Sequence, residues 1–248
     1  MACAKLSTSF SESEAYPMHK PTLLFDLDGT LVDSAPDLAH AINRALSTLG
    51  RDTYSLSEIQ TWVGNGAKVL VERALSGSST IAPDLDPSLS NEALELFFTY
   101  YQQKPCDKSR LYHTVKESLG SLHQKGHLMA IVTNKPERFI KPIIDSLLIS
   151  NYFALSIGGD TLTERKPSAA PLLYCCEQLG VLVANCIMIG DSKNDILAAK
   201  AAGMKSIGLT YGYNYGESIS QHQPEWVADR FDEILTIVDT FQPVVRPS

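Results

Sequence analysis

Two aspartates, separated by one residue, directly follow an apolar segment near the start of the chain. The segment TLLF (22–25) is followed by Asp26, Leu27, Asp28 and Gly29. If the segment is a strand, residues two positions apart at its end can face the same side, and the glycine permits a tight turn beyond them. A carboxylate pair placed in this way can supply a nucleophile and a proton donor, or bind a hard divalent cation.

The same pattern occurs a second time in the chain, which shows that Asp-x-Asp alone is weak evidence. Asp84 and Asp86 lie between Pro83 and Pro87, with no apolar segment before them. This second copy is predicted to be a solvated loop. The first copy ends an apolar segment, and this position favours a catalytic pair over a turn or helix-capping pair.

Further polar residues follow other apolar segments of the chain. They are Thr133 and Asn134 after 128–132, Lys166 after 154–157, and Asp191 and Asp195 after 186–189. Carboxylates that converge repel one another and resist ionising together. Mg²⁺, which prefers oxygen ligands, removes that repulsion. A lysine and a hydroxyl beside such a metal suit phosphate oxygens, so the residue types predict chemistry on a phosphate group.

The elements that must position these residues are short apolar segments alternating with stretches of helical periodicity. Unbroken runs are typical of strands buried on both faces of a parallel sheet. The expected strands are 22–25, 128–132, 154–157, 186–189 and 205–209, and the expected helices are 114–124, 136–148, 168–179 and 194–202. This order predicts an α/β, Rossmann-like parallel sheet. Ligands bind such sheets at the carboxyl ends of the strands, where the polar residues fall.

The connection between the first and second expected strands is far longer than a crossover requires. It has helical periodicity at 36–49, 66–76 and 90–103 and no clear strand. We therefore expect an inserted α-helical cap. The expected domains are a mobile tail (1–20), a sheet core (21–33 and 112–248) and the cap (34–111).

The composition excludes several classes of protein. The 248 residues include 21 lysines and arginines against 28 aspartates and glutamates, a net charge of −7, which argues against binding to nucleic acid or anionic membranes. No apolar run approaches the roughly 18 residues of a membrane-spanning helix. The five cysteines are odd in number and form no C-x-x-C pair, so we expect reduced, mostly packed thiols in a cytoplasmic protein. The sequence leaves a monomer or a homodimer open.

Four segments, in order, resemble the motifs of the haloacid dehalogenase-like hydrolases. They are LFDLDGTLVDS (24–34), VTNK (132–135), RKPSAAP (165–171) and IGDSKNDILAAKAAG (189–203). The resemblance covers roughly residues 21–240, and the helical insertion resembles the α-helical cap of that family. Asp28 favours the phosphatase branch, since dehalogenases of this superfamily generally lack the second aspartate.

The resemblance implies a role for each residue. Asp26 is expected to attack phosphorus and form an aspartyl-phosphate, and Asp28 to act as acid and then base. Mg²⁺ is expected to be held by Asp26, the Asp28 backbone carbonyl and Asp191. Asp195 is expected to support this site without binding the metal. Substrate phosphate is expected to be bound by Thr133, Asn134 and Lys166.

Within the superfamily, TWVGNGAKVLVERAL (61–75) and GLTYGYNYGESI (208–219) are similar to the bacterial phosphoglycolate phosphatases. This resemblance implies hydrolysis of 2-phosphoglycolate, a small phosphorylated metabolite, to glycolate and phosphate. A phosphatase for another small organic phosphate, such as a sugar phosphate, stays open. So do a phosphomutase and a non-catalytic module switched by an aspartyl-phosphate.

Two features concern the cap. Gly64 and Gly66 would let the backbone approach the carboxylate of phosphoglycolate, with the amides that open the helix at 66–76 facing it; an ordinary turn between helices is the alternative. Tyr211, Tyr213 and Tyr215 would either pack in the core or line the cap interface.

Overall fold

The computed structural model describes residues 20–244, so the predicted tail lies outside the described residues except for Lys20. Six parallel strands form one sheet in the order β5-β4-β1-β6-β7-β8. Their bounds are β1 Thr22–Phe25, β4 Met129–Val132, β5 Leu155–Ile157, β6 Cys186–Gly190, β7 Lys205–Leu209 and β8 Trp226–Ala228. The predicted α/β parallel sheet is confirmed.

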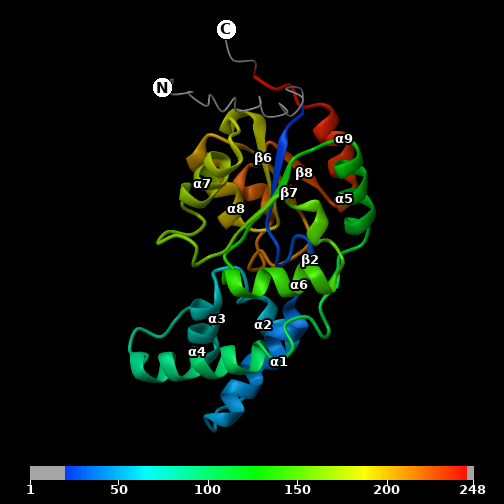
Figure 1. Cartoon of the computed structure of the whole chain (residues 1–248). Helices are drawn as coiled ribbons and strands as arrows, with labels where there is room; N and C mark the ends of the chain where they lie inside the picture. The colour runs from blue at the N-terminus through cyan, green and yellow to red at the C-terminus, as the bar shows by residue number, and fades with distance from the viewer. Residues whose placement is uncertain (1–19, 245–248) are drawn as a thin grey trace, which may run out of the picture.

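Helices cover both faces of the sheet (Figure 1). Alternate residues of β1 show how the faces are divided: Leu23 and Phe25 pack in one apolar cluster and Leu24 in another. The first cluster includes residues of α5 (Val115–Gln124), α6 (Ile140–Ser146) and α9 (Ile234–Asp239), and the second includes α7 (Ala170–Leu179) and α8 (Lys193–Ala202). Burial on both faces explains why the central strands β1, β4 and β6 are apolar without alternation.

Short 3₁₀ turns complete this part of the fold. They are η1 Glu137–Phe139, η2 Ser150–Tyr152, η3 Val183–Asn185, η4 Ile219–His222 and η5 Phe231–Glu233. All five expected strands are present, but the edge strand β8 is an element that the pattern did not predict. Its three residues are too few, and Trp226 and Val227 too exposed, to give an apolar run.

Four helices form a separate layer, which we call the helical lobe (residues 35–101), beyond one end of the sheet (Figure 1). They are α1 Ala35–Thr48, α2 Leu56–Gln60, α3 Ala67–Ser76 and α4 Pro87–Tyr101. The chain passes to and from the lobe through the antiparallel pair β2 (Val32–Asp33) and β3 (Arg110–Leu111). The division into core and cap at 34 and 111 stays a prediction.

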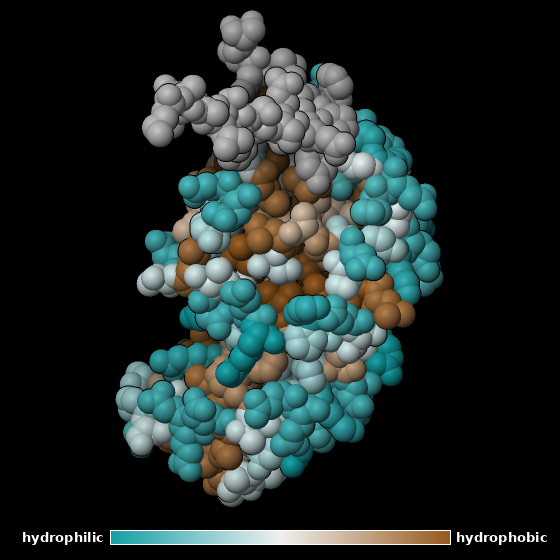
Figure 2. All heavy atoms as spheres, viewed as in Figure 1, coloured by the Kyte–Doolittle hydropathy of each residue, from teal (hydrophilic) through white to brown (hydrophobic). Residues whose placement is uncertain are grey.

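The helices of the lobe are amphipathic, with hydrophilic residues outside and apolar residues inside. Figure 2 shows hydrophilic residues over much of the lobe surface in this view, while apolar residues gather over the sheet. The buried side chains include Leu38 and Ile42 of α1 and Phe97 of α4. Asp86, predicted to lie in a solvated loop, instead caps α4, because its carboxylate accepts the amide of Ser88 at 2.9 Å.

The structure also bears on the expectations about the cysteines and about membrane-spanning helices. Cys175, Cys176 and Cys186 are buried and free, and Cys106 is partly buried and free, while Cys3 lies outside the described residues. Between residues 20 and 244, none of the helices has the length and apolar character needed to span a bilayer.

Candidate active site

The strand order brings the predicted residues to one edge of the sheet. Asp26 follows β1, which lies between β4 and β6. Thr133 therefore follows the strand on one side of Asp26, and Asp191 follows the strand on the other. Because all three strands are parallel, their carboxyl ends meet at this edge. Each of these three side chains is less than a tenth exposed.

The loop after β1 packs tightly against Asp191. The carbonyl of Leu27 accepts the amides of Leu31 and Val32, each at 3.0 Å. Gly29 has φ +91°, and a side-chain carbon built there would lie 2.8 Å from the carboxyl carbon of Asp191, so this position needs glycine. The closure of the loop also lets the Thr30 hydroxyl donate to Asp191 at 2.6 Å.

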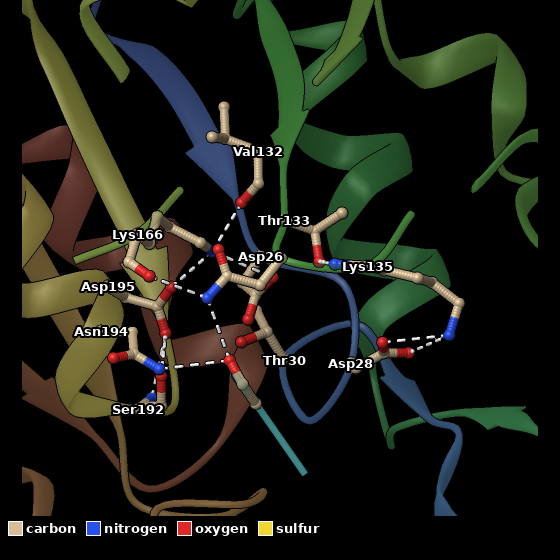
Figure 3. Close-up of polar contacts among 12 residues, drawn as sticks. Asp26, Asp28, Thr30, Val132, Thr133, Lys135, Lys166, Ser192, Asn194 and Asp195 are labelled. Atoms are coloured by element: carbon tan, nitrogen blue, oxygen red, sulfur yellow. Dashed lines mark hydrogen bonds and ion pairs between the residues drawn. The ribbon is translucent and has the colours of Figure 1, made fainter. Parts of the chain in front are cut away.

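Lys166 lies at the centre of the polar cluster (Figure 3). Its ammonium group donates to the Val132 carbonyl and to Asp195, each at 2.6 Å, and lies 3.0 Å from Asp26 Oδ1. Burial alone would lower the pKa of Lys166, but Asp195 and Asp26 raise it above its ordinary value. Lys166 therefore stays charged although it is 2% exposed.

The carboxyl groups at this edge resist ionisation without a cation. Burial raises the pKa of Asp26 to about 6, and Lys166 opposes this shift. Burial also raises the pKa of Asp191 well above its usual range, and the nearby Asp195 and Asp26 raise it further. Oxygen atoms of these three aspartates lie within 4.8 Å of one another.

The cluster fits a hard divalent cation. Asp26 Oδ1 is buried, lies 3.0 Å from the Lys166 ammonium and has no hydrogen bond of normal geometry within the described residues, so it has a lone pair that a metal ion can use. Asp191 can contribute because each carboxylate oxygen has a lone pair beyond the bonds it accepts from Thr30 and the Tyr213 amide. Asp195 is occupied differently: one oxygen accepts from Lys166 and the other from the amide and hydroxyl of Ser192.

The Asp28 side chain points away from this cluster, toward Lys135 (Figure 3). Both carboxylate oxygens of Asp28 accept from Lys135 Nζ at 3.0 Å. The prediction that Asp28 reaches a metal through its backbone carbonyl does not depend on this side chain. Asp26, Asp28, Thr133, Asn134 and Lys135 line one pocket between the sheet edge and the helical lobe.

Gly64 joins the helical lobe to the sheet edge. Its carbonyl accepts the side-chain amides of Asn134 and Asn194, each at 3.1 Å. A side-chain carbon at Gly64, where φ is +117°, would collide with the Tyr215 hydroxyl. Contact with the sheet-side loop is therefore enough to require glycine at this position.

Asn134 is placed at the site, but its side chain is engaged with the protein. Its amide nitrogen donates to Gly64 and to the Lys166 carbonyl, at 3.1 and 2.9 Å. Both side-chain N–H groups are therefore used, and the expected role of Asn134 toward phosphate rests on its backbone amide. The chain after β4 forms the 3₁₀ turn η1 only from Glu137, so Asn134 lies in the loop between β4 and that turn.

The three tyrosines divide between the two alternatives considered for them. Tyr213 is buried, and its amide donates to Asp191 at 2.6 Å. Tyr211 donates to the Thr30 carbonyl at 3.1 Å. Tyr215 accepts from Asn194 at 3.0 Å and adjoins the helical lobe at Gly64.

Sequence reasoning assigned no role to Lys135 or Asn194, although both lie within the recognised motifs. Their partners come from remote parts of the chain, 107 residues away for Asp28 and 130 for Gly64. The only signal in the sequence was that Lys135 is next to Asn134 and Asn194 is next to Asp195. This signal did not reveal which groups Lys135 and Asn194 would contact.

A site with these motifs on this sheet defines a family. The model of the haloacid dehalogenase-like hydrolases matches residues 23–209, and the chain belongs to that family. Within this family, the chain is similar to proteins named phosphoglycolate phosphatase.

A phosphoglycolate phosphatase of Colwellia psychrerythraea is 58% identical over 216 residues, covering 87% of this chain and 96% of the relative. One from Vibrio parahaemolyticus is 49% identical, covering 87% and 95%. The crystal structure of a predicted phosphoglycolate phosphatase from Haemophilus somnus has a TM-score of 0.81 at 41% identity, covering 88% and 97% of the two chains. The chain is a phosphatase of this family.

Proposed function

We propose that the protein hydrolyses 2-phosphoglycolate to glycolate and phosphate, with Mg²⁺ bound and through an aspartyl-phosphate. The substrate name comes from the relatives that are 58% and 49% identical. The observation that carries the mechanism is the position of Asp26, buried beside Lys166 on a central strand.

Asp26 is the nucleophile in this proposal. A carboxylate oxygen forms a bond to phosphorus while the bond from phosphorus to the glycolate oxygen breaks in line with it. Water then attacks phosphorus and releases phosphate, which restores the Asp26 carboxylate. The Lys166 ammonium, 3.0 Å from Asp26, stabilises the negative charge of the phosphoryl oxygens. Thr133 and the Asn134 amide supply further donors.

Asp28 is the acid and base. It lines the same pocket as Asp26, where the leaving oxygen of a bound substrate would lie. Asp28 gives its proton to that oxygen and later accepts one from the attacking water. Contact with Lys135 holds the carboxylate toward the pocket and away from Lys166.

Asp26, Asp191 and the Asp28 backbone carbonyl would hold Mg²⁺, which when bound supplies positive charge against the phosphoryl oxygens. Asp195 orients Lys166 and accepts from Ser192, and so belongs to the support of the site. The helical lobe acts as a cap that excludes water from the pocket. The free thiols fit a cytoplasmic enzyme.

A phosphate-release assay tests the function. The purified protein is assayed with Mg²⁺ on 2-phosphoglycolate, a sugar phosphate and an aryl phosphate, and again with a chelator. We expect the highest kcat/KM for 2-phosphoglycolate and loss of turnover with the chelator. A sugar phosphate that ranks first would overturn the substrate, and a product that keeps the phosphoryl group would indicate a phosphomutase.

Removal of Mg²⁺ should lower stability in a pH-dependent way. The raised pKa of Asp26, about 6, means that the metal-free fold retains a proton that the unfolded chain releases near about pH 4. The metal-free protein therefore loses stability as the pH rises from about 4 to above 6. Mg²⁺ binds the ionised form, so its stabilising effect grows over the same interval.

Thermal unfolding at about pH 5 and about pH 7.5, with Mg²⁺ and with a chelator, checks this. At about 100 times the dissociation constant, Mg²⁺ should add roughly 2–3 kcal/mol at the higher pH and less at the lower. Asp191→Asn should remove most of the gain, and Asp84→Asn in the second Asp-x-Asp copy should keep it. An equal gain at both pH values would contradict the linkage.

A further inference from the structure

The pocket between the helical lobe and the sheet edge contains a buried hydroxyl whose proton has no acceptor of normal geometry within the described residues. Tyr101, the last residue of α4, is 2% exposed; within residues 20–244 its hydroxyl makes no hydrogen bond of normal geometry, and the Lys135 ammonium is the polar group beside it. Burial raises the pKa of Tyr101 to about 12, so the hydroxyl keeps its proton and can donate it. Burying a hydroxyl whose proton has no acceptor destabilises the protein, and a bound acceptor would remove that cost.

Lys135 places a positive charge beside this hydroxyl. Its ammonium nitrogen lies 4.8 Å from the centre of the Tyr101 ring, and both residues line the pocket. A lysine ammonium has three N–H donors. Both oxygens of Asp28 accept from this group, and it also faces the Tyr101 hydroxyl oxygen. The pocket therefore offers a cation and a hydroxyl donor next to each other.

The start of α3 borders the same pocket. Gly66 is the N-cap of α3 and provides no side-chain acceptor, and Gly66 and Ala67 both line the pocket. The free amides of a first helical turn favour an anion. The other walls of the pocket are apolar and include Leu38, Leu70 and Phe97. Against these walls the hydroxyl groups of a sugar would have no hydrogen-bond partners.

We propose that Lys135, the Tyr101 hydroxyl and the amino end of α3 form a carboxylate subsite. It binds the non-reacting acid group of the substrate while the phosphate lies at Asp26. The inference deepens the proposed function and rests on it, since a phosphate ester with a short acidic arm is the ligand that joins the two ends.

The two cations nearest in sequence to the amino end of α3 do not serve this subsite. Lys68 pairs with Glu72 at 3.8 Å, and its side chain is 57% exposed. Arg73 donates to the carbonyls of Trp62 and Ser79. Neither lines the pocket. Lys68 is therefore a suitable control for Lys135.

The test compares two substrates that differ in one group, 2-phosphoglycolate and 2-hydroxyethyl phosphate. Tyr101→Phe removes only the hydroxyl and should lower kcat/KM for 2-phosphoglycolate by about 10- to 100-fold, with less than about 3-fold loss for the neutral ester. Lys135→Met should lower kcat for both, because Asp28 loses its partner, and should raise KM for 2-phosphoglycolate alone. Tyr100→Phe and Lys68→Met should leave both substrates unchanged.

Equal losses on the two substrates in Tyr101→Phe, with the thermal transition of the variant preserved, would overturn the subsite and leave the proposed function standing. A second pair of substrates, the acid 3-phosphoglycerate and its alcohol counterpart glycerol 3-phosphate, tests whether the subsite can be right when the proposed function is wrong. If 2-phosphoglycolate is not the preferred substrate but the acid of this second pair is preferred, and Tyr101→Phe abolishes that preference, the subsite holds and the proposed function fails. If neither acid is preferred by the unchanged protein, both are wrong.

Discussion

Asp26→Asn is expected to reduce phosphatase turnover by at least about 10³-fold, because an amide oxygen is a poor nucleophile toward phosphorus. The substitution keeps the size of the side chain, and it removes a buried carboxylate whose pKa is raised to about 6 mainly by burial. We therefore expect the fold to be retained. Steady-state kinetics with the best substrate measures the loss, and circular dichroism with thermal unfolding checks the fold.

The second Asp-x-Asp copy supplies the control for this experiment. Asp84 is exposed and lies outside the pocket, so Asp84→Asn should keep full turnover. Trapping of a phosphorylated protein with labelled substrate should succeed for the unchanged protein and fail for Asp26→Asn. Turnover of Asp26→Asn within about 10-fold of the unchanged protein would show that another group is the nucleophile.

Lys166→Met is expected to destabilise the protein by about 3–5 kcal/mol and to reduce turnover by about 10²-fold or more. Lys166 is 2% exposed and contacts Asp195 at 2.6 Å and Asp26 at 3.0 Å. Its removal leaves these carboxylates buried without a cation. Chemical denaturation measures the free energy of unfolding, and addition of Mg²⁺ should recover part of it.

A second substitution tests the cause of this loss. If the unpaired charge of Asp195 is responsible, adding Asp195→Asn to Lys166→Met should recover about 1–2 kcal/mol of the lost stability. A surface pair gives the comparison: Lys141 contacts Asp145 with a side chain that is 79% exposed, so Lys141→Met should change stability by less than about 1 kcal/mol. A Lys166→Met protein as stable as Lys141→Met would contradict the buried-pair argument.

The sequence could predict the sheet and most of the elements that form it. Strands buried on both faces are apolar throughout, and that pattern identified β1, β4 and β6. The partly buried β5 and β7 were identified from their shorter apolar runs. The edge strand β8 was missed because an exposed three-residue strand has no such pattern. Helix α4 begins at Pro87, earlier than predicted, because Asp86 caps it and Pro87 fits the first helical turn.

The sequence also determined which residue types follow the strands, and parallel strands bring those residues to one edge. This is why Asp26, Thr133 and Asp191 could be grouped before any geometry was known. The motifs that these residues share with the haloacid dehalogenase-like hydrolases gave the family, which the match over 23–209 confirms.

Only the tertiary structure decided which atoms meet. Lys166 contacts both Asp26 and Asp195, and Asp28 turns toward Lys135. The helical lobe brings Tyr101 to the pocket from α4. The periodicity of a sequence reports which face of an element is buried, but contacts between segments more than a hundred residues apart depend on how the elements pack. For that reason the sequence could name the carboxylates, and the fold had to show which cation each of them pairs with.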